Sequence, residues 1–163
     1  MTTLARAPRL LIGDVRVGDE LPELRYDVTS TTVVLGALAT RDWRPQHHDY
    51  HFATERNGVR DIFLNTPNQA AWLERYVTDW TGPHGRLGAL QFRMADSVFP
   101  GEAMSITGSV TDVETDEAGC GWVGLRMSVV QGGRLCTTAT ARVAVPNDPS
   151  DNPWRRRGAD WRP

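Results

Sequence analysis

The clearest hydrophobic pattern in the chain runs from residue 66 to residue 81. Apolar side chains recur there every three or four positions, at Ala70, Ala71, Leu73, Tyr76, Val77 and Trp80. This spacing puts them on one face of a helix, so it predicts a helix that packs against a core. Thr66 or Asn65 can cap its start, and Pro67 suits its first turn, where no backbone N–H is needed. Gly82 and Pro83 are expected to end it.

Strands are predicted on both sides of this helix. Polar and apolar positions alternate in five runs, over residues 21–28, 87–94, 104–113, 121–130 and 135–145. The last two runs flank Gly132-Gly133, which is a hairpin signal. One long helix and about five mostly antiparallel strands predict an α+β fold, in which a sheet wraps around a central helix.

The remaining segments are shorter or less regular. A short helix is expected from Thr29 or Ser30 to about residue 38. Residues 51–63 are polar and irregular, with a turn or helix end at Asn57-Gly58.

The chain divides into three parts by composition: an arm at residues 1–16, a single domain at 17–146, and a tail at 147–163 that is rich in Pro, Arg and Trp. We expect the tail to be solvated and disordered. The alternative is that its tryptophans dock on a neighbouring subunit.

Composition excludes several classes of function. The 163 residues carry a net charge of −2, which gives no reason to expect nucleic acid or a membrane surface as partner. All 18 basic residues are Arg, so Schiff-base and P-loop lysine chemistry are excluded. Cys120 and Cys136 are poorly placed to form a disulfide with each other and are expected to be reduced thiols. With neither a signal peptide nor a membrane-length apolar run visible, we expect a cytoplasmic protein.

One loop carries candidate catalytic chemistry. In residues 41–49, Asp42 is followed five positions later by His47, with Pro45 between them. Proline excludes a regular helix there, so an irregular turn can aim both side chains at one point. A proton-accepting carboxylate beside an imidazole suits acid–base work on a water molecule. The plain alternative is a polar surface loop.

The same loop also raises the question of a metal site. His47, His48, Asp49 and His51 are four possible ligands within five residues. Adjacent histidines tend to point apart, and zinc ligands are usually spaced more widely. We therefore expect no metal, and nothing in the sequence calls for a cofactor.

Three motifs, taken in order, resemble the MaoC-like family of (R)-specific enoyl-CoA hydratases and acyl dehydratases, which has the hot-dog fold. The first is Asp42-x-x-Pro45-x-His47-x-Asp49, the second is Thr78-Asp79-Trp80-Thr81-Gly82-Pro83, and the third is Val98-Phe99-Pro100-Gly101-Glu102. The resemblance covers roughly residues 17–145.

The resemblance implies a lyase that hydrates a trans-2-enoyl-CoA to the (3R)-hydroxyacyl-CoA, or catalyses the reverse dehydration. Asp42 and His47 would be the catalytic residues and would hold the water. The backbone N–H of Thr66 would stabilise the thioester oxyanion at the start of the central helix. We expect Asn65, Phe63 and Arg93 to contact the substrate, although a solvated strand face explains Arg93 equally well.

The sequence departs from the common family pattern at two places. Most members have His-Gly where this chain has Asn65-Thr66, and an Asn where it has Arg44. One branch of the family resembles the chain in these departures: the small subunits of actinobacterial hydratases that act on a steroid side-chain enoyl-CoA. That resemblance implies a bulky acyl-CoA and a heteromer with a second MaoC-like subunit. A homodimer remains the alternative assembly.

Two other functions stay open. The chain could be a non-catalytic or half-site subunit whose partner carries the chemistry, as the Asn65-Thr66 departure suggests. An acyl-CoA thioesterase on the same fold would need a carboxylate on the central helix, for which Glu74 and Asp79 are the candidates.

Overall fold

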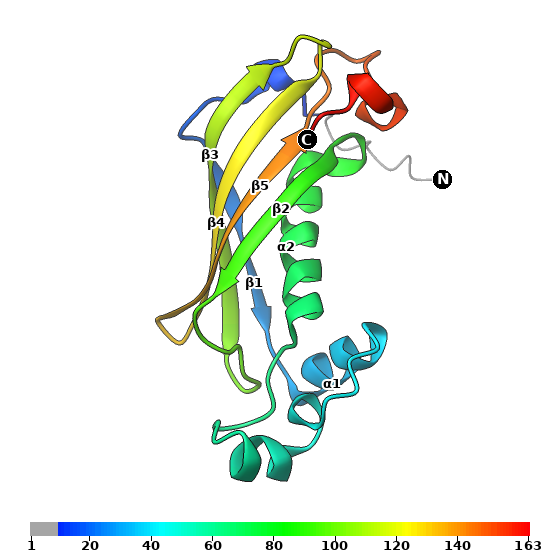
Figure 1. Cartoon of the computed structure of the whole chain (residues 1–163). Coiled ribbons are helices and arrows are strands. Elements are labelled where there is room, and N and C mark those ends of the chain that lie inside the picture. The colour runs from blue at the N-terminus through cyan, green and yellow to red at the C-terminus, as the bar shows by residue number, and fades with distance from the viewer. Residues whose placement is uncertain (1–9) are drawn as a thin grey trace, which may run out of the picture.

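The structure is a computed structural model and describes residues 10–163. Within them one antiparallel sheet has the strand order β1-β3-β4-β5-β2. The strands are β1 (Glu20–Asp27), β2 (Arg86–Met94), β3 (Ala103–Thr115), β4 (Gly121–Gln131) and β5 (Arg134–Ala144). The curved sheet wraps along helix α2 (Thr66–Thr81), and the shorter α1 (Ser30–Ala39) lies beyond the start of α2 (Figure 1). The predicted sheet around a central helix is confirmed.

The core lies between α2 and one face of the sheet. Leu73 and Val77 of α2 are completely buried, and so are Ile106 and Val143 of the sheet. On β4, buried positions largely alternate with more accessible ones, because successive side chains of a strand point to opposite faces. Burial of this apolar layer is the main force that holds α2 in place.

The two ends of α2 follow the sequence prediction. The side chain of Asn65 accepts a hydrogen bond from the N–H of Asn68, so Asn65 is the cap, and Pro67 lies in the first turn. Gly82 ends the helix with φ 67°, a conformation that glycine adopts without strain. The start of α2 is therefore well defined, which matters because it borders the candidate site.

The predicted hairpin and thiols are also confirmed. Gly132 and Gly133 join β4 to β5 with φ values of 56° and 76°, both in the left-handed region that a tight two-residue hairpin requires. Cys120 and Cys136 are free and fully buried. Burial raises the pKa of both thiols.

The segment expected to be irregular contains a helical turn. Residues Phe52–Arg56 form a short π-helix, which the sequence analysis missed. It ends at Asn57, whose N–H donates to Phe52 O at 3.2 Å, so the predicted helix end is confirmed. A single turn of helix has too few positions to show a hydrophobic period, which is why the pattern was not visible.

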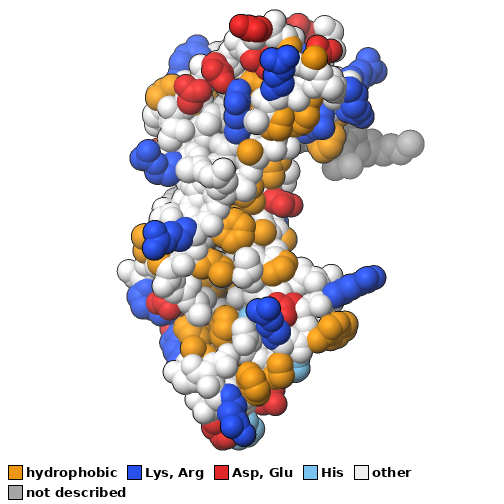
Figure 2. Space-filling view, in the orientation of Figure 1, with side chains coloured by type: hydrophobic (Ala, Val, Ile, Leu, Met, Phe, Trp, Pro, Cys, Tyr) orange, Lys and Arg blue, Asp and Glu red, His pale blue; other side chains and the backbone are white. Residues whose placement is uncertain are grey.

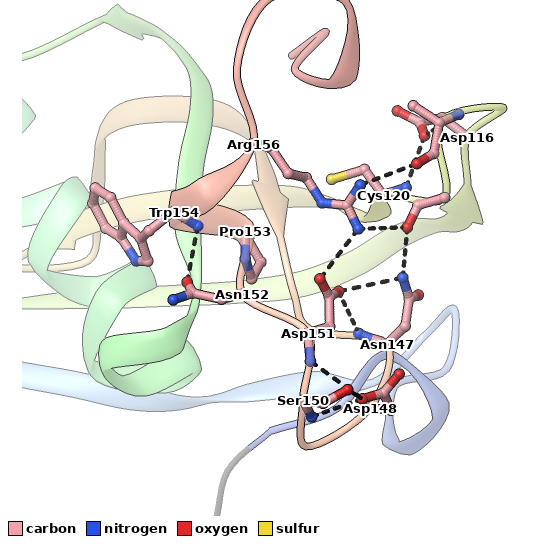
Figure 3. Close-up of polar contacts among 12 residues, drawn as sticks. Asp116, Cys120, Asn147, Asp148, Ser150, Asp151, Asn152, Pro153, Trp154 and Arg156 are labelled. Atoms are coloured by element: carbon pink, nitrogen blue, oxygen red, sulfur yellow. Dashed lines mark hydrogen bonds and ion pairs between the residues drawn. The ribbon is translucent and has the colours of Figure 1, made fainter.

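The prediction of a disordered tail is wrong. After β5 the chain folds back on the sheet, and Asn147, Asp151 and Arg156 form a network there (Figure 3). The guanidinium of Arg156 donates to Asp151 at 3.2 Å and to Gly119 O at 2.7 Å. These charge-assisted bonds tie the tail to the loop between β3 and β4.

The tail tryptophans dock on the same chain. Trp161 packs on the buried Trp122 with ring centroids 4.8 Å apart, and Arg86 lies 3.5 Å from the centre of the Trp161 ring. Trp154 donates its indole N–H to Gly85 O at 3.1 Å. Both tryptophans therefore dock on their own domain, whereas the alternative prediction placed them on a neighbouring subunit.

The N-terminal arm is only partly described. Its residues 1–9 lie outside the described residues, while Ile12 donates its N–H to Pro146 O at 2.9 Å, at the end of β5. The boundaries at residues 16 and 146 remain predictions. Among residues 10–163, none of the helices has the length and apolar character needed to span a bilayer.

Candidate active site

Asp42 is held at the end of α1 by a tight backbone turn. The Arg41 N–H donates to Leu38 O at 3.1 Å. The Asp42 N–H donates to Ala37 O at 2.9 Å, and the two bonds together form a Schellman motif. Arg41 takes its left-handed position with φ 56°, alone among the non-glycine residues of 10–163. This conformation is strained for an L-residue, and it sets the direction in which Asp42 leaves the helix.

Helices α1 and α2 approach each other closely at Gly36. A Cβ at this position would overlap the side-chain amide of Asn68, which is itself buried. Asn68 also donates from Nδ2 to Thr32 O at 3.5 Å. Because glycine allows this approach, the C-terminal end of α1 and its Asp42 lie beside the N-terminal end of α2.

Asn65 connects these helix ends through its side chain. Its Oδ1 accepts the N–H of Asn68 at 3.3 Å. Its Nδ2 donates to Asp42 Oδ2 at 3.1 Å and to Thr40 Oγ1 at 2.8 Å. The residue is 1% exposed, so both ends of a buried amide are satisfied within the protein.

His47 faces the same carboxylate from a 3-10 turn, Pro45–His47. It is buried, and its Nδ1 lies 2.8 Å from Phe63 O, while its ring packs edge-on against the Phe63 ring. Its Nε2 lies 3.5 Å from Asp42 Oδ2. The predicted pair therefore meets at one point, although the two residues come from different turns.

The hydrogen bond to Phe63 determines the tautomer of His47. A carbonyl oxygen only accepts, so Nδ1 carries the proton. In the neutral imidazole, Nε2 is then an acceptor, and it faces the carboxylate of Asp42, which is also an acceptor. Two acceptors side by side can bind a molecule that donates two hydrogen bonds, such as water.

The surroundings keep Asp42 ionised. Partial burial raises the pKa of its carboxyl, but hydrogen bonds from the Asn65 side chain and the Arg44 N–H lower it. The charge of Arg44 lowers it further, as does that of His47 when its ring is protonated, and the net result is a pKa below the ordinary value of 3.8. Near neutral pH Asp42 is therefore a carboxylate that can accept a proton.

The pair opens into a cavity of about 370 Å³. Its walls are the Asp42 loop, the start of α2, and residues 94–97 at the end of β2 and just after it. Most of the lining side chains are polar, among them Arg44, Gln46 and Asp96. Such a cavity suits the polar, reacting part of a substrate better than a long apolar chain.

The predicted oxyanion donor also borders this cavity. Thr66 is the first residue of α2 and is exposed to the cavity. Pro67 has no N–H, the N–H of Asn68 bonds to the Asn65 cap, and that of Gln69 bonds to Asn65 O. Among residues 10–163, the Thr66 N–H has no acceptor. It is thus free to bind an oxygen at the positive end of the helix.

The other predicted substrate contacts lie in different places. Phe63 lines the cavity beside His47. Arg93 is exposed on β2 and lines a separate depression that also contains Arg126. The cavity that holds Asp42 and His47 therefore does not include Arg93, and its contact with substrate remains a prediction.

Two glutamines at the cavity were missed from the sequence. Gln46 lies 3.4 Å from His47 Nε2 through its own Nε2, while its Oε1 accepts from Asn57 at 2.9 Å. Gln69 lines the cavity from α2 and is 3% exposed. Gln69 lies four residues before Leu73 on the apolar face of α2, and a polar residue at such a position is a signal in the sequence of a buried polar side chain.

The alternative chemistries find little support in this geometry. Glu74 is exposed, Asp79 is paired with Arg75 at 3.2 Å, and neither carboxylate lines the cavity. In the described part of the chain, no three His, Cys, Asp or Glu side chains gather as a metal site. His51 is exposed and pairs with Glu55 instead of joining His47.

Comparison with known proteins shows the family of this chain. No family model matches the sequence. A relative, the 3-oxo-4,17-pregnadiene-20-carboxyl-CoA hydratase beta subunit of Mycobacterium tuberculosis, is 37% identical over 97 residues, which cover 60% of this chain and 74% of the relative. The chain belongs to the MaoC-like hydratase and dehydratase family.

Solved structures agree with MaoC-like membership. A chain of the ChsH1-ChsH2 complex from Mycobacterium tuberculosis superposes with a TM-score of 0.73 and 30% identity, over 80% of this chain and 98% of that one. A MaoC-like dehydratase from Rhodospirillum rubrum gives a TM-score of 0.75 at 18% identity, over 86% and 99% of the two chains. The hot-dog fold expected from the MaoC-like resemblance is therefore confirmed.

Proposed function

We propose that the protein hydrates a trans-2-enoyl-CoA to the (3R)-hydroxyacyl-CoA, or catalyses the reverse dehydration. The observation that carries this proposal is the Asp42–His47 pair, in which two acceptors face one cavity at the start of α2. The hydratase named among its relatives supports the reaction class.

The pair suits a bound water molecule. Water that displaces the 3.4 Å contact of the Gln46 amide with His47 Nε2 can donate one hydrogen to that nitrogen and the other to Asp42. It then keeps a lone pair free to attack C3 of the enoyl thioester. Asp42 takes a proton as the C3–O bond forms, and the pair returns a proton to C2. One water is consumed, and both side chains end in the protonation states in which they began.

Negative charge grows on the thioester oxygen during this step. The free N–H of Thr66, at the positive end of α2, is our proposed donor to that oxygen. Phe63 would form a wall beside the reacting carbons, since it lines the cavity next to His47. Asn65 would act as a positioning residue, because its amide is engaged by Asp42, Thr40 and the helix cap.

The acyl group and the nucleotide would extend beyond this cavity. Two guanidinium groups, Arg93 and Arg126, share one surface depression, and arginine suits phosphate oxygens. We propose that Arg93 contacts the CoA moiety there. A bulky acyl group, such as a steroid side chain, would need more apolar volume than the largely polar cavity offers.

A second MaoC-like subunit is the proposed partner that supplies this volume. One relative is named as a beta subunit, and one solved neighbour is a two-protein complex. Strands β1 and β2 form the outer edges of the sheet, and unpaired edges favour association. Apolar side chains are also exposed along the face on which α2 lies, between two more highly charged ends (Figure 2). A heteromer is consistent with each of these features, and a homodimer is the alternative assembly.

Hydration assays on the assembled protein test the proposal. A panel of trans-2-enoyl-CoA thioesters, from short straight chains to a steroid-bearing one, is followed by loss of the conjugated enoyl absorbance. We expect Asp42→Asn to lower the rate about 100-fold or more, because it removes the general base. Asp49→Asn is the matched control, since Asp49 is exposed, caps Phe52 N–H and lies outside the cavity.

Equal activity of the wild type and Asp42→Asn would contradict a catalytic role for this chain. The protein would then be a non-catalytic subunit whose partner carries the chemistry. A loss confined to Asp42→Asn supports hydration at this site, and the preferred thioester identifies the acyl group.

A further inference from the structure

Gln69 is a buried polar residue of the cavity that the proposed reaction leaves without a role. It lies one turn after the start of α2, on the face of the helix that continues into Leu73 and the core. The residue is 3% exposed and lines the cavity that contains Asp42 and His47. A glutamine in so buried a place requires partners for both its oxygen and its nitrogen.

The oxygen of Gln69 has a partner inside the protein. Thr137 on β5 is fully buried and donates its hydroxyl to Gln69 Oε1 at 2.7 Å. Among residues 10–163 the Thr137 hydroxyl has no other acceptor. If the amide were rotated by half a turn, the hydroxyl proton would be left without a partner, so Thr137 fixes the orientation of Gln69.

The nitrogen of Gln69 is consequently free. Its two N–H groups have no acceptor among the described residues, and the residue borders the cavity. The carboxylate of Asp42 accepts from Asn65 and the Arg44 N–H and has no hydrogen bond with the Gln69 amide. The acceptor for the Gln69 amide is therefore expected to come from the molecule that fills the cavity.

The position of Gln69 indicates which atom that is. Side chains of a helix lean toward its N-terminus, and residues three apart share a face. The Gln69 amide thus extends toward Thr66, whose free N–H we assigned to the thioester oxygen. We propose that Gln69 is a second hydrogen-bond donor to this oxygen, so that two donors stabilise the developing enolate. This inference rests on the proposed hydratase function.

Kinetics on the assembled protein provide the first test. Gln69→Met keeps the length of the side chain and removes both donors. We expect kcat to fall about 10- to 100-fold and KM to rise by a smaller factor, about fivefold, since donors to an oxyanion act mainly in the transition state. Thr137→Val removes only the orienting hydroxyl and should lower kcat by a smaller factor. Glu117→Met, in the exposed loop between β3 and β4 and outside the cavity, is the matched control and should leave kcat unchanged.

Binding provides a readout that needs no turnover. Isothermal titration would compare a saturated acyl-CoA thioester with the S-alkyl-CoA thioether of the same chain length, which lacks the carbonyl oxygen. We expect the wild type to prefer the thioester by about fivefold or more, and Gln69→Met to lose most of that preference. Thermal unfolding of each variant shows whether the fold is retained, and Gln69→Glu, which is nearly isosteric, serves if Gln69→Met does not fold.

The outcomes separate this inference from the proposed function. If Asp42→Asn abolishes hydration while Gln69→Met keeps both kcat and the thioester preference, the role of Gln69 is overturned and the hydratase stands. If Asp42→Asn is fully active, the proposed function fails. A wild type without preference for the thioester overturns the role of Gln69 whether or not any substrate is hydrated.

Discussion

Asn65 caps the central helix with the oxygen of its side chain and holds Asp42 with the nitrogen, at 3.1 Å. One buried amide therefore sets both the start of α2 and the orientation of the carboxylate. The chain has this asparagine and Thr66 where the family pattern commonly has His-Gly. These two hydrogen bonds explain why this chain has an asparagine at position 65, because a shorter or longer side chain would not reach both Asp42 and the Asn68 N–H.

Replacement of Asn65 separates its two roles. Asn65→Ala removes the cap and the donor to Asp42, so we expect a loss of about 1 kcal/mol in stability and a higher pKa for Asp42. Asn65→Ser restores a capping oxygen without the donor, so stability should recover while the pKa of Asp42 stays raised. A carboxyl-carbon NMR titration measures the pKa, and urea unfolding measures the stability.

The lowered pKa of Asp42 sets how this residue changes the stability of the fold with pH. In the wild type the carboxyl ionises below 3.8, so its contribution to stability is present above that pH and is lost as pH falls through the lowered pKa. In the Asn65 variants the pKa of Asp42 lies closer to its ordinary value, so less stability should be lost as the pH falls below 3.8. An unchanged Asp42 titration in Asn65→Ala would show that the hydrogen bond does not control the carboxyl.

Glycine at position 41 should stabilise the fold. Arg41 has φ 56°, a conformation that costs an L-residue about 1 kcal/mol relative to glycine. We expect Arg41→Gly to raise the free energy of unfolding by about that amount in urea denaturation. Arg44, at φ −66° in the same loop, is the control, and Arg44→Gly should lower stability because glycine has more freedom in the unfolded chain. A less stable Arg41→Gly protein would argue against the strained turn.

Docking of the tail can be tested at Trp161. Its removal uncovers the buried Trp122 ring, so we expect Trp161→Ala to destabilise the domain by about 2 kcal/mol and to change the near-ultraviolet circular dichroism of the stacked pair. Trp154 is half exposed, and Trp154→Ala should cost less. If the tail were solvated, Trp161→Ala would leave both stability and spectrum unchanged.

Tyr76 predicts a stability change in alkali. The side chain is 3% exposed, and burial, followed by the charge of Glu23, raises its pKa to about 12 from 10.0. A raised pKa stabilises the fold at pH values below 10, and this contribution is lost as the pH rises toward 12, by about 2–3 kcal/mol in total. The chain has no lysine to obscure this range.

Variants of the tyrosines isolate that effect. Tyr76→Phe removes the titrating group, so its stability should fall less than that of the wild type between pH 10 and pH 12. Tyr50 is exposed, and Tyr50→Phe should behave as the wild type does. Identical alkaline curves for Tyr76→Phe and the wild type would contradict the raised pKa.

Local features of the fold could be predicted because their causes lie within a few residues. The cap at Asn65, the stop at Gly82 and the Gly132-Gly133 hairpin each follow from the conformations that single residues allow. Alternation of apolar residues indicated the strands for the same reason. The short spacing of Asp42 and His47, with Pro45 between them, limited these two side chains to one loop.

The sequence by itself determined the elements, the loop that carries Asp42 and His47, and the family resemblance. Only the tertiary structure decided which distant side chains meet that pair. Thr137 reaches Gln69 across 68 positions of the chain, and Asn65 reaches Asp42 across 23. Such contacts depend on strand register and helix packing, which sum over many weak interactions, so no local pattern records them. The tail was misjudged for the same reason, since its stability comes from Trp122 and Arg86, which lie far from it in sequence.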